Sequence, residues 1–153
     1  MPQFDSVWRF AENGLAKIKL DGKWGYIDKT GKLVIKPNPQ FERVGDFANG
    51  LAIVKLRGRW GYIDKTGKIV IEPQYEKAWS FTENGLAGVR VDGKWGYIDK
   101  KGKMVIEPQF ELAGYFKNGL ARVRTNEGYG YIDETGKMVI KPNFDSVAEM
   151  FSD

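Results

Sequence analysis

The chain has 153 residues, with 24 Lys and Arg against 20 Asp and Glu, and so carries a formal charge of +4. This length fits one domain or one compact repeat array, and the charge lacks the clustered basic excess of a dedicated nucleic-acid binder. The absence of cysteine and histidine excludes disulfides, thiolate or imidazole zinc sites and His-based catalytic triads. No apolar run approaches the ~20 residues of a membrane span, and we expect no signal peptide.

Internal repetition organises the whole sequence. Gly-Leu-Ala recurs at intervals of 36, 35 and 34 residues, starting at Gly14, and an aromatic-Gly-Tyr-Ile-Asp block follows each copy after the same gap. Phe4-Asp5-Ser6-Val7 returns as Phe144-Asp145-Ser146-Val147, so the chain begins and ends with the same part of a unit. We therefore predict one repeat domain over 1–153. Its parts are a partial unit at 1–13 and repeats at 14–49, 50–84, 85–118 and 119–153.

The first repeat opens with a predicted β-hairpin. Apolar and polar residues alternate from Gly14 to Leu20, which indicates a half-buried strand. Asp21-Gly22 favours a two-residue type I′ turn, because both central residues of that turn have positive φ. A second strand is then expected over 23–27. Corresponding turns are expected at Asp92-Gly93 and Arg57-Gly58, whereas the fourth repeat has its glycine one position later, at Gly128.

A third strand and a return segment complete the expected unit. Asp28-Lys29-Thr30-Gly31 predicts a type I turn closed by a glycine with positive φ, in which the Asp carboxylate accepts backbone N–H groups. The third strand, over 32–36, is expected to end at Pro37, which cannot donate to a β-ladder. The return segment has apolar residues at every third position, which predicts a short helical turn packed on the sheet: Phe41, Val44 and Phe47.

The hairpin register sorts the side chains, because directly opposed residues share a face of the sheet. The two predicted faces are an aliphatic face and an aromatic face. In the first repeat, the aliphatic face is expected to carry Ala16, Ile18, Leu20, Ile27, Leu33 and Ile35. The aromatic face is expected to carry Trp24, Tyr26 and Val34 among Lys17, Lys19 and Lys36.

These elements predict an all-β fold built from three-stranded antiparallel meanders of about 35 residues. A lone meander cannot bury its apolar side, so neighbouring repeats must cover one another. The duplicated segment at the two ends favours an open, solenoid-like tandem array. A closed barrel or propeller-like ring is the alternative.

The aromatic face is the strongest candidate for function. A stripe of aromatic and cationic side chains in every repeat is suited to stacking sugars or bases, or to anchoring an acidic peptide. The alternative is that each Trp packs against the next repeat, with a Lys or Arg lying over its ring. The candidate residues are Trp24, Tyr26, Trp60, Tyr62, Trp95, Tyr97, Tyr129, Tyr131, Lys17, Lys19, Lys55, Arg90, Arg122 and Arg124.

Catalytic and metal chemistry find less support. The turn aspartates Asp28, Asp64, Asp99 and Asp133 each stand alone, without the alternating oxygen ligands of a calcium loop, so we predict a structural role for them. No repeat has a unique pair of carboxylates, and the sequence has no phosphate-binding loop or nucleophile elbow. We expect no catalytic residues, no cofactor and no metal, and therefore a protein that is not an enzyme.

Gly-Lys-Trp-Gly-Tyr-Ile-Asp at 22–28 and 93–99, with Gly-Arg-Trp-Gly-Tyr-Ile-Asp at 58–64, resembles the WG-repeat family, also called KWG repeats. The resemblance covers essentially the whole chain. It implies a β-rich repeat, found mainly in bacteria, that is used for binding and has no catalytic residues. The fourth repeat departs from the pattern, with Tyr129 in place of Trp and a shifted Gly128.

Three functions fit these sequence features. The first is a scaffold whose repeated surface binds another protein. The second is a carbohydrate or cell-wall binding module that uses the aromatic and cationic stripe. The third is a purely structural array, and the close similarity of the repeats also fits a consensus-designed chain. Neither a specific nucleic acid nor a membrane is expected as a partner, and the sequence predicts neither a compartment nor an oligomeric state.

Overall fold

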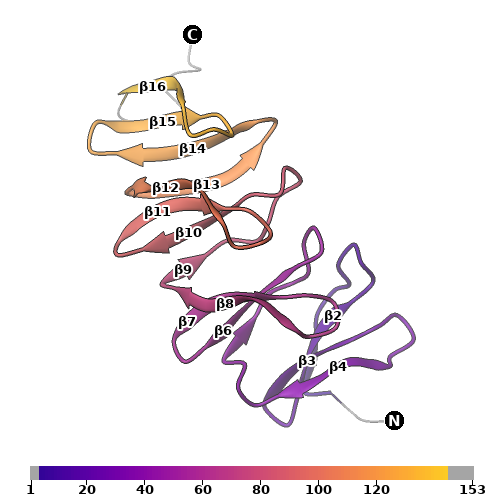
Figure 1. Cartoon of the computed structure of the whole chain (residues 1–153). Coiled ribbons are helices and arrows are strands. Elements are labelled where there is room, and N and C mark those ends of the chain that lie inside the picture. The colour runs from indigo at the N-terminus through magenta and orange to yellow at the C-terminus, as the bar shows by residue number, and fades with distance from the viewer. Residues whose placement is uncertain (1–3, 145–153) are drawn as a thin grey trace. The chain divides into compact units, whose positions relative to one another are not determined.

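The computed structural model describes residues 4–144, and the chain forms two compact units, residues 1–80 and 81–153. The described residues form strands and turns without a helix, and none of them belongs to a helix that could span a membrane. The strands build four antiparallel sheets of four strands each, which follow one another along the chain (Figure 1). The predicted all-β tandem array is confirmed.

The first two sheets have the strand orders β1-β2-β3-β4 and β5-β6-β7-β8. Within each sheet, neighbouring strands are antiparallel neighbours in sequence. The first sheet consists of β1 (Ser6–Val7), β2 (Ala16–Leu20), β3 (Lys23–Ile27) and β4 (Leu33–Asn38). The second sheet consists of β5 (Arg43–Val44), β6 (Ala52–Leu56), β7 (Arg59–Ile63) and β8 (Ile69–Tyr75).

The third and fourth sheets repeat this plan. The first sheet uses residues 6–38 and the fourth uses residues 112–144. No sheet pairs strands from the two ends of the described range, so the array is open. The third sheet consists of β9 (Lys77–Ala78), β10 (Ala87–Val91), β11 (Lys94–Ile98) and β12 (Met104–Phe110). The fourth sheet consists of β13 (Leu112–Lys117), β14 (Leu120–Thr125), β15 (Gly128–Ile132) and β16 (Met138–Phe144).

Each sheet contains the predicted three-stranded meander and a fourth strand in front of it. The helical turn predicted at 41–47 is wrong, because Arg43–Val44 forms strand β5 and pairs with β6. The amide N–H of Glu42 donates to Lys55 O at 2.8 Å, and that of Gly45 donates to Ile53 O at 2.8 Å. The edge of β6 thus satisfies the backbone groups of the return segment, which a single helical turn would leave largely unpaired.

The hairpin between β2 and β3 has the predicted register. Asp21 and Gly22 have φ values of 50° and 76°, as a type I′ turn requires. Lys17 faces Tyr26, and Lys19 faces Trp24. The predicted two-residue turn therefore fixes which side chains lie on the aromatic face.

The predicted faces of the third strand need one correction. Ile27 pairs with Leu33 as expected, but Tyr26 pairs with Ile35 instead of Val34. Val34 is the extra residue of a β-bulge and is 41% exposed. A bulge moves every following residue to the opposite face, so Ile35 lies on the aromatic face beside Tyr26.

The same irregularity explains the glycine that follows Trp24, Trp60 and Trp95. A Cβ atom on Gly25 would lie 2.6 Å from Ile35 O and 2.9 Å from Pro37 N. Gly61 and Gly96 are equally close to the backbone of β8 and β12. The Trp-Gly pair is thus a steric requirement of the bulged third strand, which approaches the second strand too closely for any side chain.

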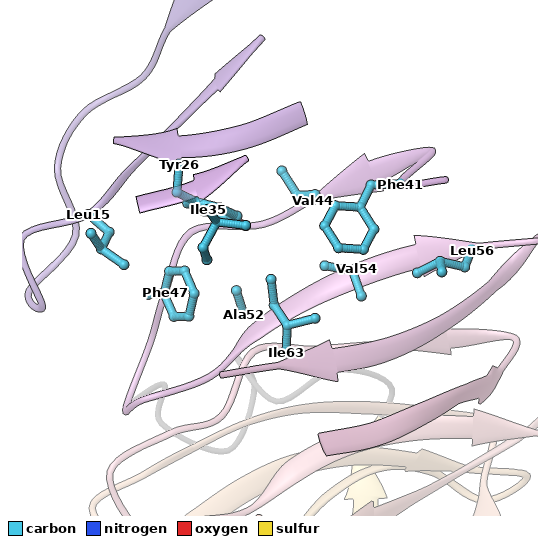
Figure 2. Close-up of a cluster of buried hydrophobic side chains, with 10 residues drawn as sticks. All are labelled: Leu15, Tyr26, Ile35, Phe41, Val44, Phe47, Ala52, Val54, Leu56 and Ile63. Atoms are coloured by element: carbon cyan, nitrogen blue, oxygen red, sulfur yellow. The ribbon is translucent and has the colours of Figure 1, made fainter. Parts of the chain in front are cut away.

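The core of the first unit lies between its two sheets, as the need for mutual covering predicted. Tyr26 and Ile35 from the aromatic face of the first sheet meet Ala52, Val54 and Ile63 from the aliphatic face of the second (Figure 2). Side chains of the return segment lie between the two layers. The buried cluster consists of Leu15, Tyr26, Ile35, Phe41, Val44, Phe47, Ala52, Val54, Leu56 and Ile63.

Candidate functional site

The tyrosines of the first three aromatic faces are buried and tie each sheet to the segment that follows it. Tyr26, Tyr62 and Tyr97 have at most 1% of their surface exposed. The hydroxyl of Tyr26 donates to Gly45 O at 2.6 Å. The hydroxyl of Tyr62 donates to Trp79 O at 2.6 Å, and that of Tyr97 donates to Gly114 O at 2.7 Å. These contacts match the packing interpretation of the aromatic face.

Burial also disfavours the ionisation of two of these hydroxyls, those of Tyr26 and Tyr97. Desolvation raises the pKa of Tyr26 and of Tyr97 above the ordinary value, because the charged phenolate is disfavoured in an apolar environment. The nearby carboxylate of Asp46 raises the pKa of Tyr26 further. The hydroxyls therefore remain neutral hydrogen-bond donors.

The predicted basic partners lie over the aromatic rings. The Lys17 ammonium is 5.8 Å from the centroid of the Trp24 ring, and the Lys19 ammonium is 5.3 Å from it. Lys55 lies 5.9 Å from the Trp60 ring. Trp8 was not predicted as part of this face, and its ring centroid lies 4.9 Å from that of Trp24.

The three predicted tryptophans do not form a uniform exposed series. Trp24 and Trp60 are half-buried, whereas Trp95 is 3% exposed and lies opposite Arg90. A regular polymer would need equivalent stacking faces at each step. The three rings do not offer such equivalent faces.

The fourth sheet keeps the aromatic face but exposes more of it. Arg122 pairs with Tyr131, and Arg124 pairs with Tyr129. The two guanidinium carbons lie 5.1 Å and 5.8 Å from the Tyr129 ring. Both tyrosines are half-buried and both arginines are exposed. The shifted Gly128, with φ of 117°, begins β15 and leaves this register intact.

A hollow of about 640 Å³ opens on this aromatic face. All of its lining residues come from the fourth sheet and its turns, and its surface is mostly apolar. Tyr115, which is 54% exposed, was not predicted from the sequence. The sequence signal for this residue is variation between repeats. The matching positions carry Arg9 in the partial unit, Asp46 and Ser80 in the first two repeats, and Glu149 in the fourth. We call this the fourth-sheet hollow; its lining includes Tyr115, Lys117, Leu120, Arg122, Tyr131 and Ile140.

The turn aspartates have the predicted turn geometry. Asp28 Oδ1 accepts hydrogen bonds from the Thr30 amide at 2.9 Å, the Thr30 hydroxyl at 2.5 Å and the Lys32 amide at 3.1 Å. The hydroxyl bond is the main reason why the pKa of Asp28 is lowered. Between residues 4 and 144, the acidic side chains form no group of three that could hold a metal ion.

The solved structures similar to this chain include β-propeller-like repeat proteins. A HIRA fragment (residues 644–1017 of that protein) is 8% identical, with a TM-score of 0.55 over 92% of this chain and 54% of its own. Hsv2 from Kluyveromyces lactis is 11% identical, with a TM-score of 0.57 over 91% of this chain and 50% of its own. The chain thus spans about half the length of these two structures, and the likeness concerns the fold alone.

Sequence comparison gives a more specific result. No curated protein matches the chain. The family described as "WG containing repeat" matches five consecutive segments, at 2–24, 24–60, 60–95, 95–129 and 129–153. The boundaries of these segments fall on the aromatic residue that precedes the buried glycine. With matches over nearly its whole length, the chain belongs to the WG-repeat family.

Proposed function

We propose that this chain is a non-catalytic scaffold that binds a protein partner through the aromatic face of its fourth sheet. The observation that carries the proposal is the fourth-sheet hollow, which is mostly apolar and lies on a face that the inner sheets use for packing. Exposed apolar surface rimmed by polar groups is typical of protein interaction sites.

The chemistry of the hollow defines the partner further. Tyr115, Leu120 and Ile140 offer apolar contact area, and Lys117 and Arg122 add positive charge at its border. Tyrosine and arginine are among the residues enriched at interaction hot spots. We therefore expect an extended partner segment with apolar side chains and a net negative charge.

A carbohydrate remains the second candidate because Trp8 and Trp24 form an accessible aromatic pair at the other end of the described range. Trp8 is 38% exposed, and the Lys17 ammonium lies 5.3 Å from its ring centroid. This pair is confined to the first sheet, however, and the buried Trp95 interrupts the series that a polysaccharide would follow.

Affinity capture and a glycan array test the proposal. Wild-type protein, Tyr115→Asp and Val105→Asp are compared as baits, because both substituted side chains are exposed but only Tyr115 lines the hollow. We expect a captured protein that Tyr115→Asp loses and Val105→Asp retains. Equal capture by all three, or binding to glycans without a protein partner, contradicts the proposal.

A further inference from the structure

The inner repeats show what an aromatic face of this chain receives. In the first unit, the segment after β4 places Val44 and Phe47 in the core, and its Gly45 carbonyl accepts the Tyr26 hydroxyl. The rings of Tyr26 and Phe47 meet edge to face with centroids 4.8 Å apart. The face therefore receives an extended segment that contributes two apolar side chains and one carbonyl.

The second unit repeats this arrangement. The segment after β12 buries Ala113 and Phe116 three and six positions after Phe110, and its Gly114 carbonyl accepts the Tyr97 hydroxyl. The rings of Tyr97 and Phe116 have the same 4.8 Å separation as the pair in the first unit. The carbonyl lies 17 residues after the tyrosine, as it also does for Tyr62 and Trp79.

The sequence after β16 has the same pattern. Val147 and Met150 follow Phe144 by three and six positions, and Ala148 follows Tyr131 by 17 positions (148 − 131). Residues 145–153 lie outside the described range, so the comparison uses their sequence alone. That sequence matches the requirements of the aromatic face at all three positions.

Charge supports the same match. Residues 145–153 contain three acidic residues and no Lys or Arg: Asp145, Glu149 and Asp153. The fourth-sheet hollow is bordered by Lys117 and Arg122. Opposite charges on a segment and on the surface that it approaches favour docking and fix its orientation.

We propose that residues 145–151 dock on the aromatic face of the fourth sheet and occupy its hollow in cis. This inference rests on the proposed function, since it makes the chain's own segment the competitor of the partner. A tethered segment acts at an effective concentration on the order of millimolar. A partner must therefore displace this segment. The partner's own segment is expected to have the same pattern: an aromatic residue, apolar residues three and six positions later, and acidic residues nearby.

Binding of a synthetic peptide tests this directly. The probe is a fluorescein-labelled peptide of residues 143–152, and its binding to the full chain is measured by fluorescence anisotropy. Val147→Asp removes an apolar contact of the docked segment. Ser152→Asp adds the same charge to the same tail outside the docking segment, and serves as the matched control.

We expect Val147→Asp to bind the peptide at least tenfold more tightly than the wild-type chain, with Ser152→Asp unchanged. Tyr115→Asp, added to Val147→Asp, should abolish that binding. Equal affinity for the wild type, Val147→Asp and Ser152→Asp, with binding abolished by Tyr115→Asp, refutes docking in cis but leaves the proposed binding face standing. Failure of every chain to bind refutes both, and binding that survives Tyr115→Asp refutes this face as the site.

A second measurement does not depend on affinity. The photoreactive residue p-benzoylphenylalanine at position 150 would take the place that Phe47 and Phe116 occupy beside their tyrosines. We expect intramolecular cross-links to residues of β14 and β15, identified by mass spectrometry. Cross-links between two copies, or none to these strands, overturn the assignment.

Discussion

The steric account of the Trp-Gly pair predicts that Gly61→Ala destabilises the second sheet far more than most glycine substitutions. A Cβ at this position would lie 2.5 Å from Ile71 O and 2.7 Å from Pro73 N, and both atoms belong to the backbone of β8. Backbone atoms cannot rotate away as a flexible side chain can. The new methyl group must therefore push β8 from β7 and weaken the ladder between them.

The expected cost follows from these distances. Overpacking costs about 1–3 kcal/mol, and we place Gly61→Ala near 3 kcal/mol because no side chain can yield. Gly58→Ala is the matched control: Gly58 has φ of 79°, with no atom within 4 Å of an added Cβ. Gly58→Ala lowers the free energy of unfolding only because alanine disfavours the left-handed conformation, by about 1 kcal/mol.

Equilibrium unfolding in urea, followed by tryptophan fluorescence, measures both free energies of unfolding. We expect the loss for Gly61→Ala to exceed that for Gly58→Ala by about 2 kcal/mol, the difference between the two costs above. A loss for Gly61→Ala no larger than that for Gly58→Ala would refute the steric reasoning. The glycine would then be present for some reason other than the close approach of β8.

Three further predictions concern the second sheet, to which Gly61 belongs. Ile63→Asp places a charge at a site with no exposed surface and should cost about 3–5 kcal/mol, whereas Val70→Asp, at an exposed position of β8, should leave thermal unfolding by circular dichroism almost unchanged. Tyr62→Phe removes the 2.6 Å bond to Trp79 O and should lower the free energy of unfolding by about 1 kcal/mol in urea titrations. Folding lowers the pKa of Asp64, chiefly through the Thr66 hydroxyl, so its contribution is complete above the unfolded pKa of about 3.9 and is lost as the pH falls through that value towards the lower folded pKa. Urea unfolding at pH 5 and pH 3 should show a smaller pH-dependent loss for Asp64→Asn than for the wild type, and an equal loss would contradict this assignment.

Features set by neighbouring residues were predictable from the sequence. The type I′ turn at Asp21-Gly22 and the opposition of Lys17 to Tyr26 depend only on residues of one hairpin. The turn at Asp28 is equally local, because its carboxylate accepts bonds from residues two and four positions later. Local backbone chemistry leaves few alternatives at such places.

Features that depend on a second element were missed. The two-residue strand Arg43–Val44 exists because β6 offers it an edge, and its own pattern gives no sign of that edge. The bulge at Val34 depends on the fit of β4 against Gly25. Burial of Tyr26 requires the next sheet, so the sequence left packing and binding as alternatives for the aromatic face. The fourth-sheet hollow was also missed. The residue at the position of Tyr115 differs between repeats, so the sequence shows no repeated pattern there.

The distribution of repeated and variable residues indicates where function can lie in such a chain. The first three repeats need the Gly after the Trp, the buried Tyr and the turn Asp for folding, so these positions cannot vary there to recognise a partner. The position occupied by Tyr115 lies directly after the carbonyl that accepts the Tyr97 hydroxyl, and its residue differs in all four repeats and in the partial unit. Its backbone is held by the repeat, while its side chain can vary from one repeat to the next. A repeat protein of this kind can therefore acquire binding specificity at the residue beside each tyrosine contact without loss of the stacked fold.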